Sequence, residues 1–238
     1  MRNITHPSRR LKHFFIESTL AEGRELPAPA PLQHRLKDVL RLSEGTEVAL
    51  FNGQQGLWRA QVGPKGKTLV VNDIIVAHPP APPPTTLALC LPKREAWESA
   101  LRQATELNVG AIQPLMSQFS QREKFNPSRA ATLVIEAAEQ CERLTLPQVH
   151  APQPFETWLQ SQTAPLAWAY ERQQPDHVAT QPRQPAHTVL IGPEGGFSPD
   201  EVAQLEAHRW VYNMSLGPTI LRTDTAVVAA LAALGGRS

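Results

Sequence analysis

The stretch TVLIGPEGGFSPDEV, residues 188–202, joins a candidate strand to a candidate helix through a glycine-rich turn. Its first five residues are mostly apolar and β-branched, which is typical of a buried parallel strand. Ser198, Pro199 and Glu201 then form a capping-box pattern, with Ser as the cap, Pro at the first helical position and Glu three residues after Ser. The pattern predicts that the loop lies at the carboxyl end of a parallel strand, where open α/β sheets bind ligands.

Two adjacent glycines, Gly195 and Gly196, form the centre of this loop. Because glycine has no Cβ, the chain can adopt positive φ there and a ligand can approach the main chain. The loop matches neither GxGxxG nor a Walker A sequence, which disfavours a dinucleotide and a triphosphate. A glycine pair alone favours a tight turn that holds no ligand.

A second segment, MSLGPTILRTDTAVVAALAAL at residues 214–234, has the same plan. A short apolar piece meets Gly217, a polar set follows, and a helix begins. A threonine on either side of Asp224 could cap this helix, and the Asp itself favours the positive end of the helix dipole. Arg222 lies among apolar neighbours, so its charge requires either a carboxylate, such as Asp224 or Glu194, or an anionic ligand.

The helix expected from AVVAALAAL, residues 226–234, has no polar face. A helix that is apolar all round is normally buried on every side. We therefore predict a homodimer through the C-terminal part of the chain, and the alternative is burial within one chain.

The region between the proline-rich segment and this C-terminal part alternates strand and helix patterns. These are TTLALCL (85–91), EAWESALRQATELN (95–108), AIQPLM (111–116) and NPSRAATLVIEAAEQCERL (126–144). Such alternation predicts βαβ units and a parallel sheet. Residues 147–187 hold seven prolines and show weak periodicity, so irregular connections are expected there.

The stretch HPPAPPPTT, residues 78–86, contains five prolines and marks a linker. The segments before it, EVALFNG (47–53), LWRAQV (57–62) and TLVVNDIIV (68–76), are short and β-branched, and glycines separate them. This pattern predicts a small barrel or meander, preceded by a short helix within residues 32–42. The expected division is a β domain at 1–77, a linker at 78–86 and an α/β domain at 87–238.

The net charge is only +1, but it is unevenly distributed along the 238 residues. Residues 1–78 carry 11 Lys/Arg against 7 Asp/Glu, and the remainder carries 12 against 15. A basic N-terminal arm favours a polyanionic partner, although a solvated terminus explains it equally well. The two cysteines, Cys90 and Cys141, belong to no Cys/His cluster, which disfavours a metal site. Without a long apolar run or a signal-peptide pattern, we expect a cytoplasmic protein that does not enter the membrane.

The two glycine segments resemble the SPOUT superfamily of methyltransferases and, within it, the RsmE family of 16S ribosomal RNA uridine-N3 methyltransferases. The resemblance is carried by ALRQATELNVGAIQPL (100–115), VIEAAEQCERLTLPQV (134–149), LIGPEGGFSPDEV (190–202) and LGPTILRTDTAVVAALAAL (216–234). HRLKDVLRL and GTEVALFNG also look like the family's PUA-like RNA-binding domain. The resemblance covers most of the chain except 147–187. It implies an α/β fold in which a C-terminal SPOUT trefoil-knot domain, with a parallel sheet, follows a small N-terminal PUA-like β-barrel.

The resemblance also implies a site for S-adenosylmethionine between the two loops. By match, one side consists of Gly192, Glu194, Gly195 and Gly196, and the other of Leu216, Gly217, Ile220, Leu221 and Arg222. Arg222 would stabilise the anion that develops on the uracil, and Asp224 would orient Arg222 or accept the proton. Contacts to RNA are expected from Arg2, Arg9, Arg10, Lys12, Arg41, Arg122 and Lys124. The implied partners are 16S ribosomal RNA in the small ribosomal subunit and a second copy of the chain.

The chain departs from the family pattern at several positions. The family usually has Lys where this chain has Gln103, Gly at Asn108 and Glu at Asp224. Two other interpretations stay open: a SPOUT methyltransferase acting on another RNA nucleotide, and an RNA-binding or assembly factor without enzymatic activity.

Overall fold

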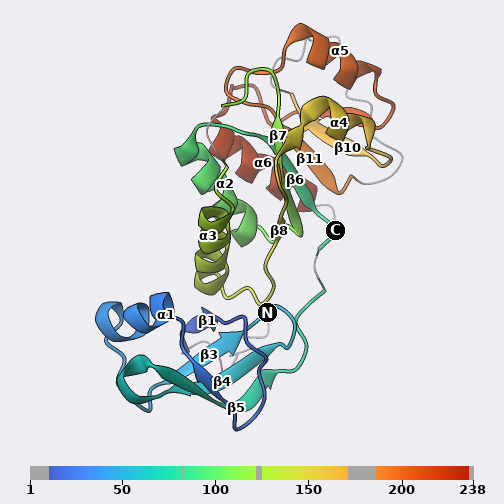
Figure 1. Ribbon diagram of the computed structural model, residues 1–238. Coiled ribbons are helices and arrows are strands. Elements are labelled where there is room, and N and C mark those ends of the chain that lie inside the picture. Colours follow the sequence, from blue (N-terminus) through green and yellow to red (C-terminus); the bar gives the residue numbers. More distant parts are fainter. Residues whose placement is uncertain (1–10, 82, 122–124, 171–185, 236–238) are drawn as a thin grey trace. The chain divides into compact units, whose positions relative to one another are not determined.

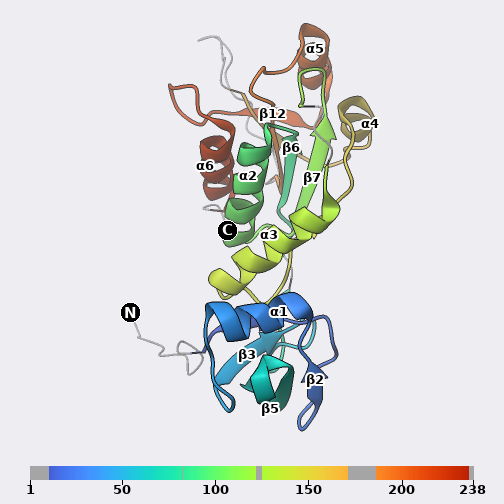
Figure 2. The same cartoon turned by 60° about the vertical axis from the view of Figure 1, so that its left-hand side comes forward.

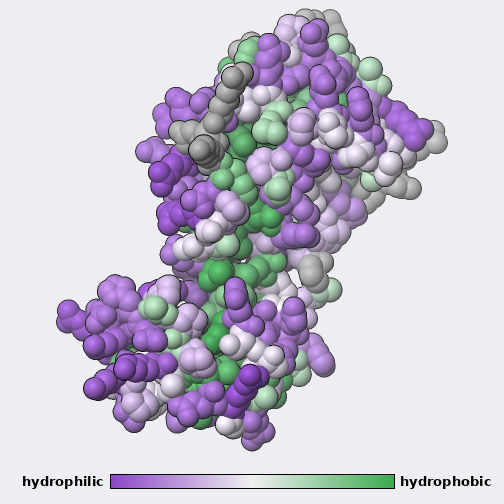
Figure 3. All heavy atoms as spheres, viewed as in Figure 1, coloured by the Kyte–Doolittle hydropathy of each residue, from purple (hydrophilic) through white to green (hydrophobic). Residues whose placement is uncertain are grey.

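The computed structural model of the protein describes residues 11–81, 83–121, 125–170 and 186–235. The chain divides into two compact units. The N-terminal unit extends to Ala81 and also includes Ala138–Leu146, and the C-terminal unit contains the rest of the described chain (Figure 1). Hydrophilic side chains cover most of the visible surface of each unit (Figure 3).

The N-terminal unit is built on a curled five-stranded sheet. Its strands are β1 (His13–Phe15), β2 (Glu25–Pro27), β3 (Glu47–Phe51), β4 (Leu57–Val62) and β5 (Thr68–Val76), in the order β1-β3-β4-β5-β2. β1 pairs with β3 in parallel, and the other neighbours are antiparallel. Helix α1 (Ala30–His34) continues into a π-helical turn, η2 (Arg35–Val39), and a short 3-10 turn, η3 (Pro64–Gly66), joins β4 to β5. The three strands predicted between residues 47 and 76 are confirmed.

Alternate residues of these strands face a core that contains Phe14, Leu36, Val48 and Leu69. A buried carboxylate at the edge of this unit comes from much later in the chain. Glu139 accepts the backbone N–H of Phe15 at 2.9 Å and an Nη2–H of Arg35 at 2.6 Å. The carboxylate therefore gives the N–H of Phe15, in an edge strand, the hydrogen-bond acceptor that it would otherwise lack.

The C-terminal unit contains a seven-stranded sheet. Its strands are β6 (Thr86–Cys90), β7 (Ala111–Met116), β8 (Gln148–Val149), β9 (Gln153–Pro154), β10 (Leu166–Ala169), β11 (Thr188–Ile191) and β12 (Val211–Met214). The order is β12-β10-β11-β6-β7-β8, and β9 also pairs with β7. Every pairing between these strands is parallel, which confirms the sheet predicted from the βαβ pattern.

Helices cover both faces of this sheet. They are α2 (Arg94–Glu106), α3 (Pro127–Gln140), α4 (Phe155–Gln160), α5 (Pro199–Ala207) and α6 (Thr223–Gly235). Helix α6 packs beside α2, and Figures 1 and 2 both show α4 on the other side of the sheet. On the α4 side, Phe155 and Leu205 share a core with Cys90, Leu190 and Trp168.

The expectation of irregular connections over residues 147–187 is wrong for much of that stretch. It contains β8, β9, helix α4 and β10, and β10 lies inside the sheet between β11 and β12. The four residues of β10, LAWA, are too few for an alternation pattern to stand out beside so many prolines. Tertiary pairing on both sides stabilises this strand. Residues 171–185 lie outside the described residues.

Helix α6 is only partly buried within this chain. Val227, Ala230 and Leu231 are buried, whereas Val228 is 37% exposed and Ala232 and Ala233 are exposed. Burial on all sides within one chain, the alternative weighed for this helix, is therefore not observed. Over the described residues, no helix is long and apolar enough to cross a membrane.

Candidate functional site

The loops at the carboxyl ends of several strands meet at one edge of the parallel sheet. Ile191 at the end of β11 is in register with Leu89 of β6 and Ala169 of β10. Ala169 is in register with Met214, the last residue of β12. The segments that follow, 91–93, 117–121, 192–198 and 215–222, therefore gather at this edge, where open α/β sheets bind ligands.

The glycine-rich loop owes its shape to two different requirements. The N–H of Gly196 donates to the carbonyl of Pro193 at 2.8 Å, and Gly196 has a φ of +75°, which L side chains rarely adopt. A Cβ on Gly192 would lie 2.9 Å from the ring of Phe197. A Cβ on Gly195 would lie 3.1 Å from the Cβ of Phe119. The absence of a Cβ at Gly192 and Gly195 thus allows close packing within the protein, and Gly196 allows the positive φ of the turn.

The ring of Phe197 supports the loop from the side of the core. It lies 5.1 Å from the ring centre of Phe155 and 5.9 Å from that of Trp168. Both neighbours are buried, so Phe197 cannot move aside easily. The loop that follows β11 is held by this aromatic cluster.

Glu201 connects helix α5 to the loop after β7. The capping box predicted from the sequence is confirmed: Ser198 Oγ accepts the N–H of Glu201 at 3.3 Å, and Glu201 Oε2 accepts the N–H of Ser198 at 2.9 Å. Glu201 Oε1 also accepts the N–H of Gln118 at 2.8 Å. The second contact links residues 83 positions apart, and a local motif could not reveal it.

Glu194 makes a comparable link to the loop after β6. Its Oε1 accepts the backbone N–H of Lys93 at 3.2 Å. Among the described residues, Arg222 forms no ion pair, so the salt bridge to Asp224 or Glu194 considered from the sequence is wrong. The side chain of Arg222 is exposed. Its charge therefore remains available to an anionic ligand.

The second predicted loop, residues 215–222, leads directly into helix α6. Gly217 has a φ of +118° with open space where a Cβ would be, and Ile220 is 71% exposed. The carbonyl of Arg222 accepts the N–H of Ala226 at 2.8 Å, so the helical bonding starts at this residue. Asp224 Oδ1 accepts the N–H of Thr225 at 2.9 Å, in the first turn of the helix. Thr223 and Thr225, the two candidate caps, both lie inside the helix, so neither is its N-cap residue.

The residues predicted to contact RNA are only partly described. Lys12 and Arg41 are exposed in the N-terminal unit, and Arg41 has a φ of +51°. Arg2, Arg9, Arg10, Arg122 and Lys124 lie outside the described residues.

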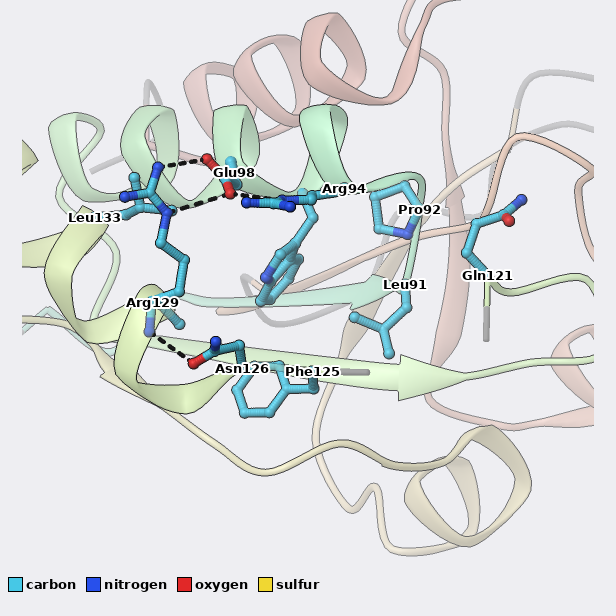
Figure 4. A pocket seen from close by; sticks show the side chains of 11 residues that line it. Leu91, Pro92, Arg94, Glu98, Gln121, Phe125, Asn126, Arg129 and Leu133 are labelled. Atoms are coloured by element: carbon cyan, nitrogen blue, oxygen red, sulfur yellow. Dashed lines mark hydrogen bonds and ion pairs between the residues drawn. The ribbon is translucent and has the colours of Figure 1, made fainter. Parts of the chain in front are cut away.

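A cavity of about 310 Å³ lies within the C-terminal unit, between the start of α2 and the start of α3 (Figure 4). Arg94, Glu98 and Arg129 lie at this cavity, and Trp97 and Phe125 contribute aromatic walls. The lining includes no residue from 192–196 or 216–222. Sequence reasoning missed this cavity, because only the packing of α2 against α3 brings its residues together.

The electrostatics of the cavity centre on Glu98. Arg129 donates to both its oxygens, at 2.8 and 3.3 Å, and Arg94 donates to Oε1 at 3.1 Å. The hydrogen bond from Arg129, followed by that from Arg94, lowers the pKa of Glu98 to about 2. Glu98 therefore stays ionised at any physiological pH and holds both guanidinium groups in place.

The chemistry at the sheet edge suits an amphiphilic, charged ligand. Apolar side chains at Leu216, Ile220 and Leu221 can contact a flat ring, and the space where a Cβ would stand on Gly196 and Gly217 is open. The exposed guanidinium of Arg222 adds one positive charge. A search of the described residues finds no group of three or more His, Cys, Asp or Glu that could hold a metal ion.

Comparison with known families matches residues 79–235 to an RNA methyltransferase domain and residues 36–72 to an RNA methyltransferase PUA domain. Among curated relatives, ribosomal RNA small subunit methyltransferase E from Rickettsia conorii is 30% identical over 94% of each chain. The protein of that name from Synechocystis is 35% identical over 84% of this chain and 69% of the relative.

Two solved structures share the fold at 26% identity. One is a putative methyltransferase from Legionella pneumophila in complex with S-adenosylmethionine, with a TM-score of 0.81 over 96% of this chain and 98% of the other. The other is ribosomal RNA small subunit methyltransferase E from Neisseria gonorrhoeae bound to S-adenosylmethionine, with a TM-score of 0.77 over 95% and 98%.

Proposed function

Because the chain belongs to the RNA methyltransferase family, we propose that it transfers a methyl group from S-adenosylmethionine to 16S ribosomal RNA of the small ribosomal subunit, at N3 of one uridine. One observation carries this proposal. Two glycine-containing loops meet at the carboxyl edge of a parallel sheet that is shared, over nearly the whole chain, with relatives crystallised with S-adenosylmethionine. The ribosomal substrate follows the relatives' names.

Two parts of the chain would divide this work. We place the methyltransferase activity in residues 87–238 and RNA binding in residues 1–77, joined by the proline-rich linker at 78–86. The matches of 79–235 to the methyltransferase domain and of 36–72 to the PUA domain support this division. A trefoil knot formed by the C-terminal segment belongs to the same proposal, as does a cytoplasmic location, where ribosomal subunits are found.

The cofactor would lie between the loops 192–196 and 216–222. Leu216, Ile220 and Leu221 would enclose the adenine, and main-chain groups near Gly196 and Gly217 would form hydrogen bonds with its polar edge. Glu194 is bonded to the N–H of Lys93, so its contribution would be to fix the loop. Gly192 and Gly195 would contribute by letting Phe197 and Phe119 approach, which keeps the loop close to the sheet.

Bound S-adenosylmethionine supplies an electrophilic methyl group on a sulfonium. The N3–H of uridine lies on the Watson–Crick edge, so the base must be unpaired or flipped out of a helix. N3 loses its proton, a bond forms between N3 and the methyl carbon, and the carbon–sulfur bond breaks. The products are N3-methyluridine, S-adenosylhomocysteine and a proton.

Arg222 and Asp224 would carry out the protein's part of this reaction. The guanidinium of Arg222, unpaired among the described residues, would stabilise the negative charge on the uracil oxygens as N3 loses its proton. Asp224 uses Oδ1 for the N–H of Thr225. Its other oxygen would accept the proton through water.

A homodimer through helix α6 is part of the proposal. The exposed apolar side chain of Val228 and the neighbouring exposed alanines form a surface that a second copy would cover. Light scattering coupled to gel filtration measures the mass directly. A dimer that Val228→Asp converts to monomer supports this arrangement, and a monomeric wild-type protein contradicts it.

The activity is tested by incubating the protein with labelled S-adenosylmethionine and either unmodified small subunits or naked 16S RNA. Mass spectrometry then identifies the methylated nucleoside. N3-methyluridine at one site supports the proposal. A different methylated nucleoside indicates another RNA methyltransferase, and cofactor-dependent RNA binding without transfer indicates an assembly factor.

The role of Arg222 has its own test. We expect Arg222→Ala to lower kcat by about 100-fold or more, the typical loss when one stabilising donor is removed, while most S-adenosylmethionine affinity remains. Arg209→Ala removes another exposed cation, close before β12, and serves as the control. Near-normal turnover by Arg222→Ala would exclude the catalytic role.

A further inference from the structure

The cavity between α2 and α3 is distinct from the cofactor loops but attached to them by specific contacts. The N–H of Gln121, which lines the cavity, donates to the carbonyl of Leu91, also in the lining, at 2.9 Å. Two residues further on, Lys93 donates its N–H to Glu194 in the glycine loop. A ligand in the cavity would therefore sit beside the cofactor loops without touching them.

We propose that this cavity binds an unpaired nucleotide of the RNA substrate next to the methylated uridine, with the base against Phe125 and the phosphate on Arg94 and Arg129. The proposal rests on the function proposed above, because the RNA is the ligand. The methylated uridine itself must reach the methyl group, and no residue of 192–196 or 216–222 lines the cavity. A nucleotide next to the methylated uridine could occupy the cavity while the uridine itself lies at the cofactor loops.

The aromatic pair supplies the surface for the base. Trp97 is buried at 9% exposure, and its ring lies 6.1 Å from that of Phe125 at an interplanar angle of 64°. Trp97 thus supports Phe125 edge to face, while Phe125 stays partly exposed. Stacking on a partly exposed aromatic ring is the usual way in which proteins bind unpaired bases.

The two arginines supply the site for the phosphate. Figure 4 shows Arg94 and Arg129 reaching Glu98 from different helices. Arg94 uses its Nε in that contact, which leaves its terminal amino groups for another acceptor, and its side chain is 72% exposed. Two guanidinium groups against one carboxylate give the cavity lining a net charge of +1. A prearranged guanidinium pair is well suited to phosphate oxygens.

The size of the cavity agrees with this ligand. A volume of about 310 Å³ lies at the lower end of the range for small-ligand pockets and suits one nucleotide. The amide side chains of Gln121 and Asn126 also line it and can form hydrogen bonds with the edge of a base. The cavity thus combines an aromatic surface, a positive edge and neutral polar groups.

Arg129 and Arg102 offer a matched comparison. Both form ion pairs with Oε2 of Glu98, at 2.8 and 3.5 Å, and their side chains are 42% and 43% exposed. Only Arg129 lines the cavity. The experiment measures the affinity of Arg129→Ala, Arg102→Ala and wild type for a fragment of 16S RNA over a range of salt concentrations, together with methyl transfer to that RNA.

We expect Arg129→Ala to raise Kd and KM for RNA about tenfold and to reduce the slope of log K against log salt by about 0.7, the loss for one phosphate contact on a single strand. Arg102→Ala should match wild type in both, and the Kd for S-adenosylmethionine should not change. Phe125→Ala should weaken RNA binding by about tenfold or more, and Phe125→Trp should restore it, as expected of base stacking.

Equal salt slopes and equal RNA affinities for Arg129→Ala and Arg102→Ala would overturn the proposal. Loss of RNA binding in Phe125→Ala that Phe125→Trp does not restore would also count against it, since a merely structural role predicts no rescue through stacking. A wild-type protein that binds RNA but transfers no methyl group contradicts the proposed function, and the salt slopes still test the cavity separately.

Discussion

Glu201 is the side chain through which two loops of the candidate site depend on one another, and its removal should be measurable. It accepts the N–H of Ser198 at 2.9 Å and that of Gln118 at 2.8 Å, and it is buried at 6% exposure. Hydrogen bonds to a charged group contribute about 1.5–3 kcal/mol each. Because Gln118 is exposed and water can replace one partner, we expect Glu201→Ala to lower the free energy of unfolding by about 2–4 kcal/mol.

Two other variants separate this effect from a general loss of charge. Glu201→Gln keeps the shape and one acceptor oxygen, but its amide nitrogen cannot accept a hydrogen bond, so it should lose about half as much. Glu206→Ala removes an exposed carboxylate from the same helix and should change stability by less than about 0.5 kcal/mol.

Urea denaturation followed by tryptophan fluorescence provides the assay, since Trp168 lies in the core below this helix. Calorimetric titration with S-adenosylmethionine should show weaker binding in Glu201→Ala, because the loop after β11 loses its support. An unfolding free energy for Glu201→Ala within about 0.5 kcal/mol of wild type would refute the reasoning, because removing a buried carboxylate that accepts two main-chain N–H groups should cost more than that.

Two further predictions concern the cavity and the glycine loop. The pKa of Glu98 is lowered to about 2 by Arg129, so the contribution of Glu98 to stability is complete above the ordinary carboxyl pKa and is lost as the pH falls toward 2. Acid denaturation should show that Glu98→Gln is less stable than wild type at pH 6 and that this difference shrinks below pH 4. A difference that stays constant with pH would contradict this. Gly192→Ala should lower both stability and S-adenosylmethionine affinity, because its Cβ would lie 2.9 Å from Phe197 in a packed aromatic cluster, and a melting temperature equal to that of wild type would show that the ring can yield.

The parts of the fold that could be predicted from the sequence are those with a pattern in consecutive residues. Strands β3, β4 and β5 are short apolar stretches separated by glycines, and the capping box at Ser198 lies in four consecutive residues. Strand β10 has no such pattern. Its four residues become a strand because β11 and β12 pair with it on both sides, and that pairing depends on residues far away in the chain.

The candidate site, too, could be predicted only where the pattern is local. Its glycines and the position of Arg222 after a short strand were visible in the sequence, because main-chain turns impose residue types. The contact of Glu201 with the N–H of Gln118 and that of Glu98 with Arg129 were not, because each joins groups from different helices or loops. Nothing in the sequence indicated that a Cβ on Gly195 would lie 3.1 Å from the Cβ of Phe119, because that contact joins two loops.

The inclusion of Ala138–Leu146 in the N-terminal unit has a consequence for how this chain can be divided. Glu139 caps the first strand, and Ala138 packs with Phe51 and Leu57, so the N-terminal unit is completed only after more than half of the chain has been synthesised. A fragment that stops at the proline-rich linker would expose those side chains and leave the N–H of Phe15 without its carboxylate. On the ribosome, the first unit must therefore wait for the end of helix α3, and gene fusions or circular permutants that move this helix would separate one folding unit into two pieces.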